Sequence, residues 1–134
     1  MSHTEAKSPR FRQGEATLRA VLSDAHVERS EAAMTEFDAP FQALITEAAW
    51  GHLWSRGDWS KRERSIVTIA LLAAFGHTDE LAMHIRATAR TGATEADVRE
   101  ALLHVAIYAG VPPANTAFRV AKQVFAEMAA EKAQ

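Results

Sequence analysis

The sequence predicts an all-α protein in a single helical domain that covers residues 14–134. Glycine and proline are scarce, at 6 and 4 of the 134 residues, while alanine and leucine, which are good helix formers, are frequent. Apolar residues recur at helical spacing, and no segment has the alternation that is typical of a strand. Residues 1–13 are polar and include Pro9, so we expect a flexible N-terminal segment.

Charge and composition exclude several classes of protein. The formal net charge is only −2, which argues against a nucleic-acid-binding domain, and the absence of cysteine excludes disulfide scaffolds and thiolate catalysis. The longest apolar stretch, residues 66–75, is too short to span a bilayer, and the polar start is unlike a signal peptide. We therefore expect a soluble, cytoplasmic protein with no nucleic-acid partner and no membrane partner.

The first half of the chain is predicted to contain two helices. The first is a short helix over residues 15–22. The second begins at Pro40, because proline suits the first turn of a helix, and its apolar residues keep helical spacing. We expect this helix to run to about Trp54, since residues 56–58 are typical of a turn.

Four further helices follow, each with its own start or stop signal. Ser60 with Glu63, and Thr94 with Asp97, have the spacing of a capping box, and Thr78 is expected to cap a helix as well. Glycine ends three of the four helices, because it adopts the left-handed conformation that a helix end favours. About six helices are predicted in all. The last four cover residues 61–75 before Gly76, 79–90 before Gly92, 95–109 before Gly110, and 113–130.

Two of the predicted helices are apolar on nearly all sides. The apolar residues cover most of the circumference between Ser65 and Phe75, and again between Val98 and Ala109. A domain of this size has too little interior to bury both helices completely. We therefore expect an obligate oligomer in which subunit interfaces cover the remaining apolar surface.

Glu80 and His84 are the first candidates for catalysis, because they lie one helical turn apart. A carboxylate at this spacing can fix the tautomer of a histidine and stabilise its charged form, as general acid–base catalysis requires. The more common interpretation of such a pair is an exposed surface contact. His77 lies on nearly the same face, so a zinc or iron site is a further alternative, although this spacing is no known ligand motif.

Three other features each allow two interpretations. Arg64 is the last charge before an apolar segment, so it either extends to solvent or binds an anion. His104 lies in an apolar helix, where it is more often a core histidine than a residue that lines a pocket with Tyr108. Trp50 and Trp54 are more often core or interface aromatics than an aromatic wall of a binding site.

Five segments occur in one order and without a large gap, and the last of them is the most specific. Together they resemble the carboxymuconolactone decarboxylase family over nearly the whole chain, from about residue 12 to residue 127. The segments are AWG with WSR at 49–51 and 54–56, RERS at 62–65, TIALL at 68–72, ELAMHIR at 80–86 and IYAGVPPANTAF at 107–118.

The resemblance implies a helical fold of the alkylhydroperoxidase-D-like type and a hexamer built as a trimer of dimers. Members of the family convert 4-carboxymuconolactone to 3-oxoadipate enol-lactone and carbon dioxide in protocatechuate degradation. They use no cofactor, so we expect neither a cofactor nor a metal. The resemblance implies that His84 and Glu80 are catalytic. The residues that it implies for substrate binding are Arg64, Trp50, Trp54, Tyr108, His104 and His77.

The sequence departs from related proteins at several positions. Alkylhydroperoxidase-D-like proteins use a Cys-x-x-Cys pair, which would fall on His77 and Glu80, so peroxidase activity is not expected. His52 and His104 stand where the family commonly has an acidic residue and a glutamine. Two alternatives are therefore kept: a decarboxylase of another unsaturated lactone or keto acid, and a non-catalytic oligomeric binding protein.

Overall fold

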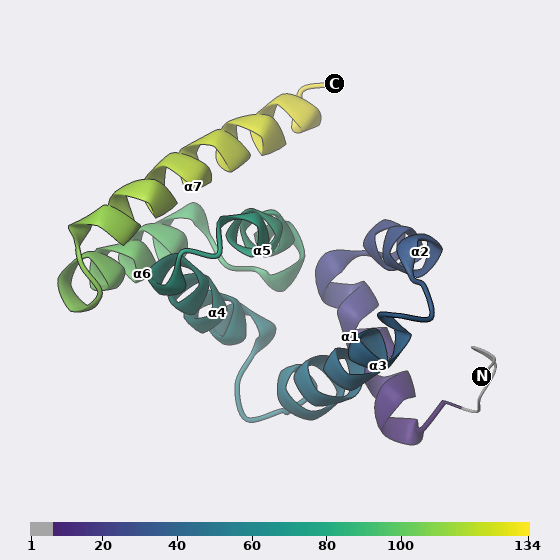
Figure 1. The fold of residues 1–134 in the computed structure, drawn as a ribbon. Coiled ribbons are helices and arrows are strands. Elements are labelled where there is room, and N and C mark those ends of the chain that lie inside the picture. Colours follow the sequence, from purple (N-terminus) through teal and green to yellow (C-terminus); the bar gives the residue numbers. More distant parts are fainter. Residues whose placement is uncertain (1–6) are drawn as a thin grey trace. The chain divides into compact units, whose positions relative to one another are not determined.

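The computed structural model describes residues 7–134, and within them it contains helices and no strand (Figure 1). This confirms the predicted all-α class. The chain divides into two compact units, which we call the N-terminal unit (up to Trp59) and the C-terminal unit (from Ser60). A single domain over residues 14–134 stays a prediction.

The first helix of the N-terminal unit begins earlier than the sequence predicts. Helix α1 spans Pro9–Leu22, because the hydroxyl of Ser8 accepts a hydrogen bond from the backbone N–H of Phe11 at 3.0 Å and Pro9 occupies the first turn. The prediction of a flexible segment is therefore wrong for residues 9–13, and residues 1–6 lie outside the described part of the chain.

A second helix in this unit was not predicted. Helix α2 spans Asp24–Ala33 and is separated from α1 by one residue, Ser23. Ser23 has φ 97° and ψ 156°, and its hydroxyl accepts a hydrogen bond from the backbone N–H of His26 at 3.2 Å. One serine thus ends α1 and caps α2, and serine is a common capping residue.

The single helix predicted over residues 40–54 is also corrected. The chain instead forms α3 over Ala39–Ile45, followed by a π-helix, η1, over Thr46–Trp54. A π-helix pairs residues i and i+5, so its turns are wider than those of an α-helix. No residue of α3 is buried, while η1 packs against α1 and buries Thr46, Trp50, Gly51 and Trp54.

The C-terminal unit follows the predicted helices closely. Its helices are α4 (Lys61–Phe75), α5 (Thr78–Thr91), α6 (Glu95–Tyr108) and α7 (Val111–Lys132). Both predicted capping boxes are formed, and both Gly76 and Gly92 have positive φ at the helix ends. Two details are wrong. His77 and not Thr78 occupies the cap position of α5, and α7 begins at Val111, two residues before the predicted start.

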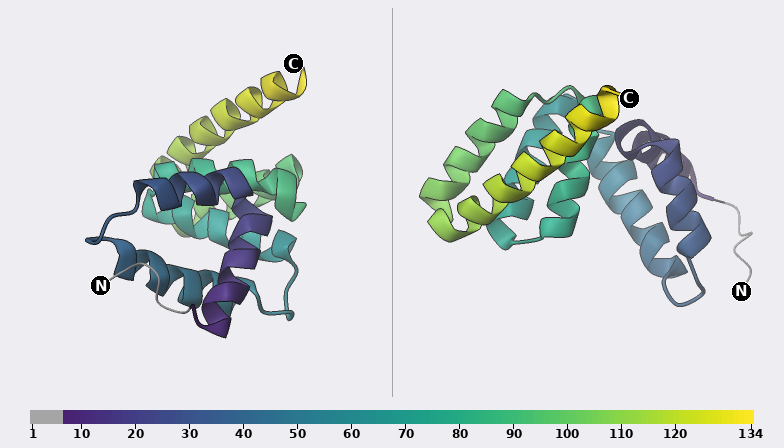
Figure 2. Two further views of the ribbon diagram at one scale, coloured as in Figure 1. Left: turned by 90° about the vertical axis from the view of Figure 1, so that its right-hand side faces the viewer. Right: turned by 90° about the horizontal axis from the view of Figure 1, so that it is seen from above.

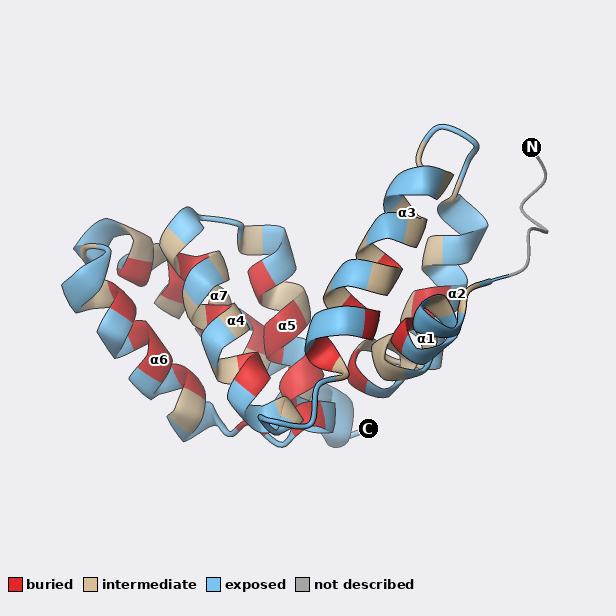
Figure 3. Cartoon of the chain, turned by 90° about the horizontal axis from the view of Figure 1, so that it is seen from below, coloured by how far each residue is buried: buried red, intermediate tan, exposed pale blue. Residues whose placement is uncertain are grey.

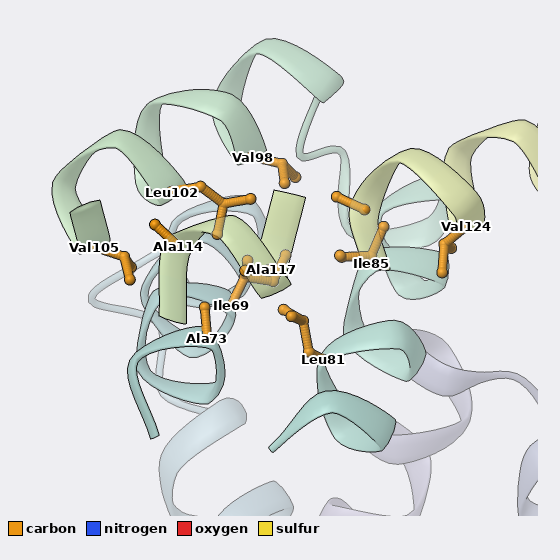
Figure 4. Close-up of a cluster of buried hydrophobic side chains, with 11 residues drawn as sticks. Ile69, Ala73, Leu81, Ile85, Val98, Leu102, Val105, Ala114, Ala117 and Val124 are labelled. Atoms are coloured by element: carbon orange, nitrogen blue, oxygen red, sulfur yellow. The ribbon is translucent and has the colours of Figure 1, made fainter. Parts of the chain in front are cut away.

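All four helices of this unit contribute to one apolar core (Figure 4). Helix α7 packs against each of the other three, as the views in Figure 2 show. The buried side chains lie at helical spacing on each element, which explains why the periodicity of the sequence located these helices. The core residues are Ile69, Ala73, Leu81, Ile85, Val98, Leu102, Val105, Ala114, Ala117, Ala121 and Val124.

The nearly continuous apolar surfaces of α4 and α6 are not fully buried within the chain. Figure 3 shows buried and exposed bands alternating along α6. Large apolar side chains remain exposed on both helices, including Leu71 at 53%, Phe75 at 73% and Ile107 at 79%. None of the described helices is long and apolar enough to cross a membrane.

Candidate active site

Arg64 is buried, with only 9% of its surface exposed. The interpretation in which this guanidinium extends into solvent is therefore wrong. A buried cation is costly unless a negative or polar group meets it. The binding of an anion by Arg64 stays a prediction.

Interactions at the start of α4 fix the turn that carries Arg64. The side chain of Glu63 accepts hydrogen bonds from the backbone N–H and from the hydroxyl of Ser60, both at 2.9 Å. These donors lower the pKa of the Glu63 carboxyl. Arg62, between them, binds Asp97 at the start of α6. The first turn of α4 is thus held both locally and by a neighbouring helix, which limits the positions open to Arg64.

Ser65, which follows Arg64, is completely buried and is not among the residues predicted for the site. No residue in the described part of the chain forms a hydrogen bond with its hydroxyl. Buried hydroxyl groups normally have a partner, so this side chain is suited to binding a water molecule or a polar ligand. A polar residue at the start of an apolar helix was the only signal of it in the sequence.

His84 lies in the middle of α5 and is buried, with 6% of its surface exposed. Glu80 is one turn earlier, but its side chain is exposed and forms no hydrogen bond or ion pair with any described residue. The buried side of α5 includes Leu81, His84 and Ile85, and Glu80 lies outside it. The structure therefore does not bring Glu80 onto His84, and the catalytic roles of both residues stay predictions.

His77 is exposed at the cap position of α5, and its ring centroid is 6.1 Å from that of Phe75. The metal-site alternative required His77, Glu80 and His84 to converge. Across residues 7–134, no group of three or more such side chains is arranged to hold a metal ion. The geometry therefore does not support the ligand interpretation of these three residues.

His104 and Tyr108 are brought together on α6. Their ring centroids are 6.3 Å apart with an interplanar angle of 12°, and both side chains are exposed, Tyr108 to 86%. The interpretation of His104 as a core histidine is therefore wrong. The pair forms an aromatic surface on the C-terminal unit.

Trp50 and Trp54 form a second aromatic pair, in η1 of the N-terminal unit. Their ring centroids are 5.2 Å apart and their planes are tilted by 35°. Both are buried, at 7% and 4% exposure. Burial agrees with the interpretation of core or interface aromatics, and a substrate-binding role for the pair stays a prediction.

The C-terminal unit also has a cavity of about 350 Å³. It lies between the end of α4, the start of α5 and the start of α7, and none of the residues predicted for catalysis or substrate binding lines it. The lining is mostly apolar and consists of Leu72, Ala73, Gly76, Thr78, Leu81, Pro112, Pro113, Thr116 and Ala117.

Comparison with known proteins assigns the family. The sequence profile described as "Carboxymuconolactone decarboxylase family" matches residues 39–123. The chain belongs to the carboxymuconolactone decarboxylase family. It is 41% identical to the 4-carboxymuconolactone decarboxylase of Acinetobacter baylyi over 119 residues, which cover 89% of each chain. It is also 36% identical over 118 residues to the nitrosuccinic acid decarboxylase npaB of Metarhizium robertsii, covering 88% of this chain and 82% of that protein.

The part of the chain that matches the carboxymuconolactone decarboxylase family extends from the start of α3 into α7. All eight residues that the sequence analysis proposed for the site lie within it. Helices α1 and α2 precede the matched residues. The match to the family therefore does not cover the surface of α1 that packs on η1.

Proposed function

We propose that this protein is a carboxy-lyase that converts 4-carboxymuconolactone to 3-oxoadipate enol-lactone and carbon dioxide. The observation that carries the proposal is the 41% identity to a 4-carboxymuconolactone decarboxylase over 89% of both chains. The burial of Arg64 and His84 supports it, because both polar side chains are held inside the family's helical region. A role in protocatechuate degradation follows from this activity.

The reaction is plausible without a cofactor, because the substrate can accept the electrons itself. When the bond to the ring carboxylate breaks, its electron pair moves through the ring double bond into the lactone carbonyl. The product of this step is a delocalised dienolate, and protonation of the carbon next to the carbonyl gives the enol-lactone. The protein must therefore hold the substrate, stabilise the oxyanion and supply one proton.

The proposed roles follow this division of tasks. His84 supplies the proton or stabilises the oxyanion, and Glu80 assists it if the carboxylate turns toward the ring in the substrate complex. Arg64 binds a carboxylate, since a buried guanidinium can donate two parallel hydrogen bonds to one carboxylate group. The aromatic and histidine side chains proposed to contact the rest of the substrate are Trp50, Trp54, Tyr108, His104 and His77.

We also propose that the active protein is a homo-oligomer, a hexamer built as a trimer of dimers. The apolar side chains exposed on α4 and α6 support self-association, because a monomer would leave them in water. Light scattering of the purified protein at micromolar concentration should give a mass well above 14.7 kDa. A stable monomer would contradict this part of the proposal. A cytoplasmic location stays a prediction.

A second candidate function is favoured by the similarity to npaB. Nitrosuccinic acid, like 4-carboxymuconolactone, carries two carboxylates and a group that can accept the electrons left by carbon dioxide. The test is to measure carbon dioxide release from both acids by the purified protein. We expect the higher kcat/KM with 4-carboxymuconolactone. A preference for nitrosuccinic acid would reassign the substrate, and release from neither would favour a non-catalytic binding protein.

The same assay tests whether a metal is needed. After dialysis against a chelator, we expect the decarboxylase activity to be unchanged, because the substrate itself accepts the electrons. Loss of activity that one divalent ion alone restores would contradict this mechanism.

A further inference from the structure

Two backbone carbonyls near the C-terminus of η1, those of Trp50 and Gly51, accept hydrogen bonds from side chains. In a π-helix the carbonyl of Gly51 would accept from the N–H of residue 56. The N–H of Arg56 instead donates to the carbonyl of Leu53 at 3.1 Å. Both carbonyls lie in the last turn of η1, and side chains commonly donate to carbonyls at the end of a helix.

Side chains supply these donors, and one of them comes from α1. The guanidinium of Arg10 donates to the carbonyl of Gly51 at 3.1 Å. The hydroxyl of Ser55 donates to the carbonyl of Trp50 at 2.6 Å. Thr17 of α1 lies 2.7 Å from the Ser55 oxygen, and because Ser55 uses its one proton on Trp50, Thr17 is the donor in this contact.

The hydroxyl of Thr17 can reach Ser55 because α1 and η1 approach unusually closely. A Cβ atom on Gly14 would lie 2.1 Å from the carbonyl oxygen of Thr46, and one on Gly51 would lie 2.5 Å from the carbonyl oxygen of Arg10. Both positions therefore require glycine. A separate contact, from the hydroxyl of Ser8 to Glu47 at 3.1 Å, joins α1 to the opposite end of η1.

We propose that Thr17 and Ser55 are positioning residues for the Trp50–Trp54 pair, and through it for substrate binding. The chain of hydrogen bonds from Thr17 through Ser55 to the Trp50 carbonyl fixes the last turn of η1, from which both indole rings project. The part that concerns substrate rests on the proposed function, in which this pair contacts the substrate. The part that concerns the geometry of the tryptophans stands without it.

The test uses Thr17→Val, which keeps the shape of the side chain and removes its hydroxyl, together with Ser55→Ala. Near-ultraviolet circular dichroism reports the environment of the tryptophans, and steady-state kinetics separates KM from kcat. We expect both variants to change the tryptophan signal and to raise KM about fivefold, the equivalent of one hydrogen bond, with kcat little changed. Thr17→Ser restores the hydroxyl and should restore both readouts.

Ser8→Ala is the matched control, because it removes a contact between α1 and η1 at the end away from the tryptophan carbonyls. It also removes the cap of α1, so it should lower Tm while leaving the tryptophan signal and KM unchanged.

Identical spectra for Thr17→Val, Ser55→Ala and the wild type would overturn the proposal. An altered spectrum with unchanged KM, in an enzyme that decarboxylates, would overturn its substrate part. If the wild type released no carbon dioxide, the proposed function would fail, and the spectra alone would decide whether these residues position the tryptophans.

Discussion

The guanidinium of Arg62 binds the carboxylate of Asp97 through two hydrogen bonds, from Nε to Oδ2 at 2.8 Å and from Nη2 to Oδ1 at 2.7 Å. Asp97 also accepts a hydrogen bond from the backbone N–H of Thr94 at 2.9 Å. Arg62 is the main cause, and Thr94 a further one, of a pKa of Asp97 that falls from 3.8 to about 2. One carboxylate therefore caps α6 and joins its first turn to that of α4.

This pair predicts a loss of stability in acid. Because the folded state lowers the pKa of Asp97, its stabilisation is complete above about pH 4. It is lost as the pH falls through the folded-state pKa of about 2. We expect Asp97→Asn to lower Tm at pH 7. We also expect Tm of this variant to fall less than that of the wild type between about pH 4 and about pH 2. Glu95→Gln is the control, because Glu95 lies in the same turn and forms no ion pair among the described residues. If the two variants change Tm equally, the Arg62–Asp97 pair adds no stability beyond that of a negative charge at the start of α6.

Ser65→Ala should make the free protein more stable. Its hydroxyl is buried without a hydrogen bond to any described residue, and leaving such a group unpaired costs about 1 kcal/mol or more. We expect the free energy of unfolding in urea to rise by about 1 kcal/mol. Thr88→Val provides the contrast, because the buried hydroxyl of Thr88 donates to the carbonyl of Ile85 at 2.6 Å and its removal should destabilise. A fall in stability for Ser65→Ala would mean that an ordered water satisfies the hydroxyl.

Ser23→Gly should also be stabilising. Ser23 has φ 97° and ψ 156°, a region that is nearly restricted to glycine and costs other residues about 1–3 kcal/mol. Glycine loses only a few tenths of a kcal/mol as a helix cap relative to serine, so we expect a net gain of about 1 kcal/mol. Ser23→Ala keeps the strain and loses the cap, so it should lower Tm. If Ser23→Gly unfolds at a lower temperature than the wild type, the capping hydrogen bond outweighs the strain.

His84→Ala should lower kcat by roughly two to four orders of magnitude, the usual scale of general acid–base catalysis. His104→Gln introduces the residue that the family commonly has, and because His104 is exposed on α6 we expect kcat to stay within about tenfold of the wild type. The measurement is steady-state decarboxylation of 4-carboxymuconolactone. Equal losses in the two variants would assign chemistry to His104.

Arg64→Lys should raise KM more than it lowers kcat. Lysine keeps the charge but lacks the planar group that can bind a carboxylate through two hydrogen bonds. Arg99→Lys, on the exposed side of α6, is the control and should leave both constants unchanged. If Arg64→Lys unfolds the protein and KM of the folded fraction is unchanged, Arg64 has a structural role, and the carboxylate must be bound by another cation, such as Arg56 or Arg119.

The sequence by itself determined the helical class and most helix ends in the C-terminal unit. The capping boxes at Ser60 and Thr94, and the glycines at 76 and 92, act through hydrogen bonds and backbone angles within a few residues, so local sequence is sufficient to predict them. The same local signals failed where one serine serves two helices, because the conformation of Ser23 depends on the packing of both.

Only the tertiary structure decided which polar residues are buried. Arg64 and His84 are inside while Glu80 and His104 are exposed, although helical spacing placed all four beside apolar residues. The π-helix likewise depends on α1, whose Gly14 contacts a backbone more than thirty residues away in the sequence. Burial and close helix contacts are set by residues distant along the chain, and periodicity within one helix carries no information about them.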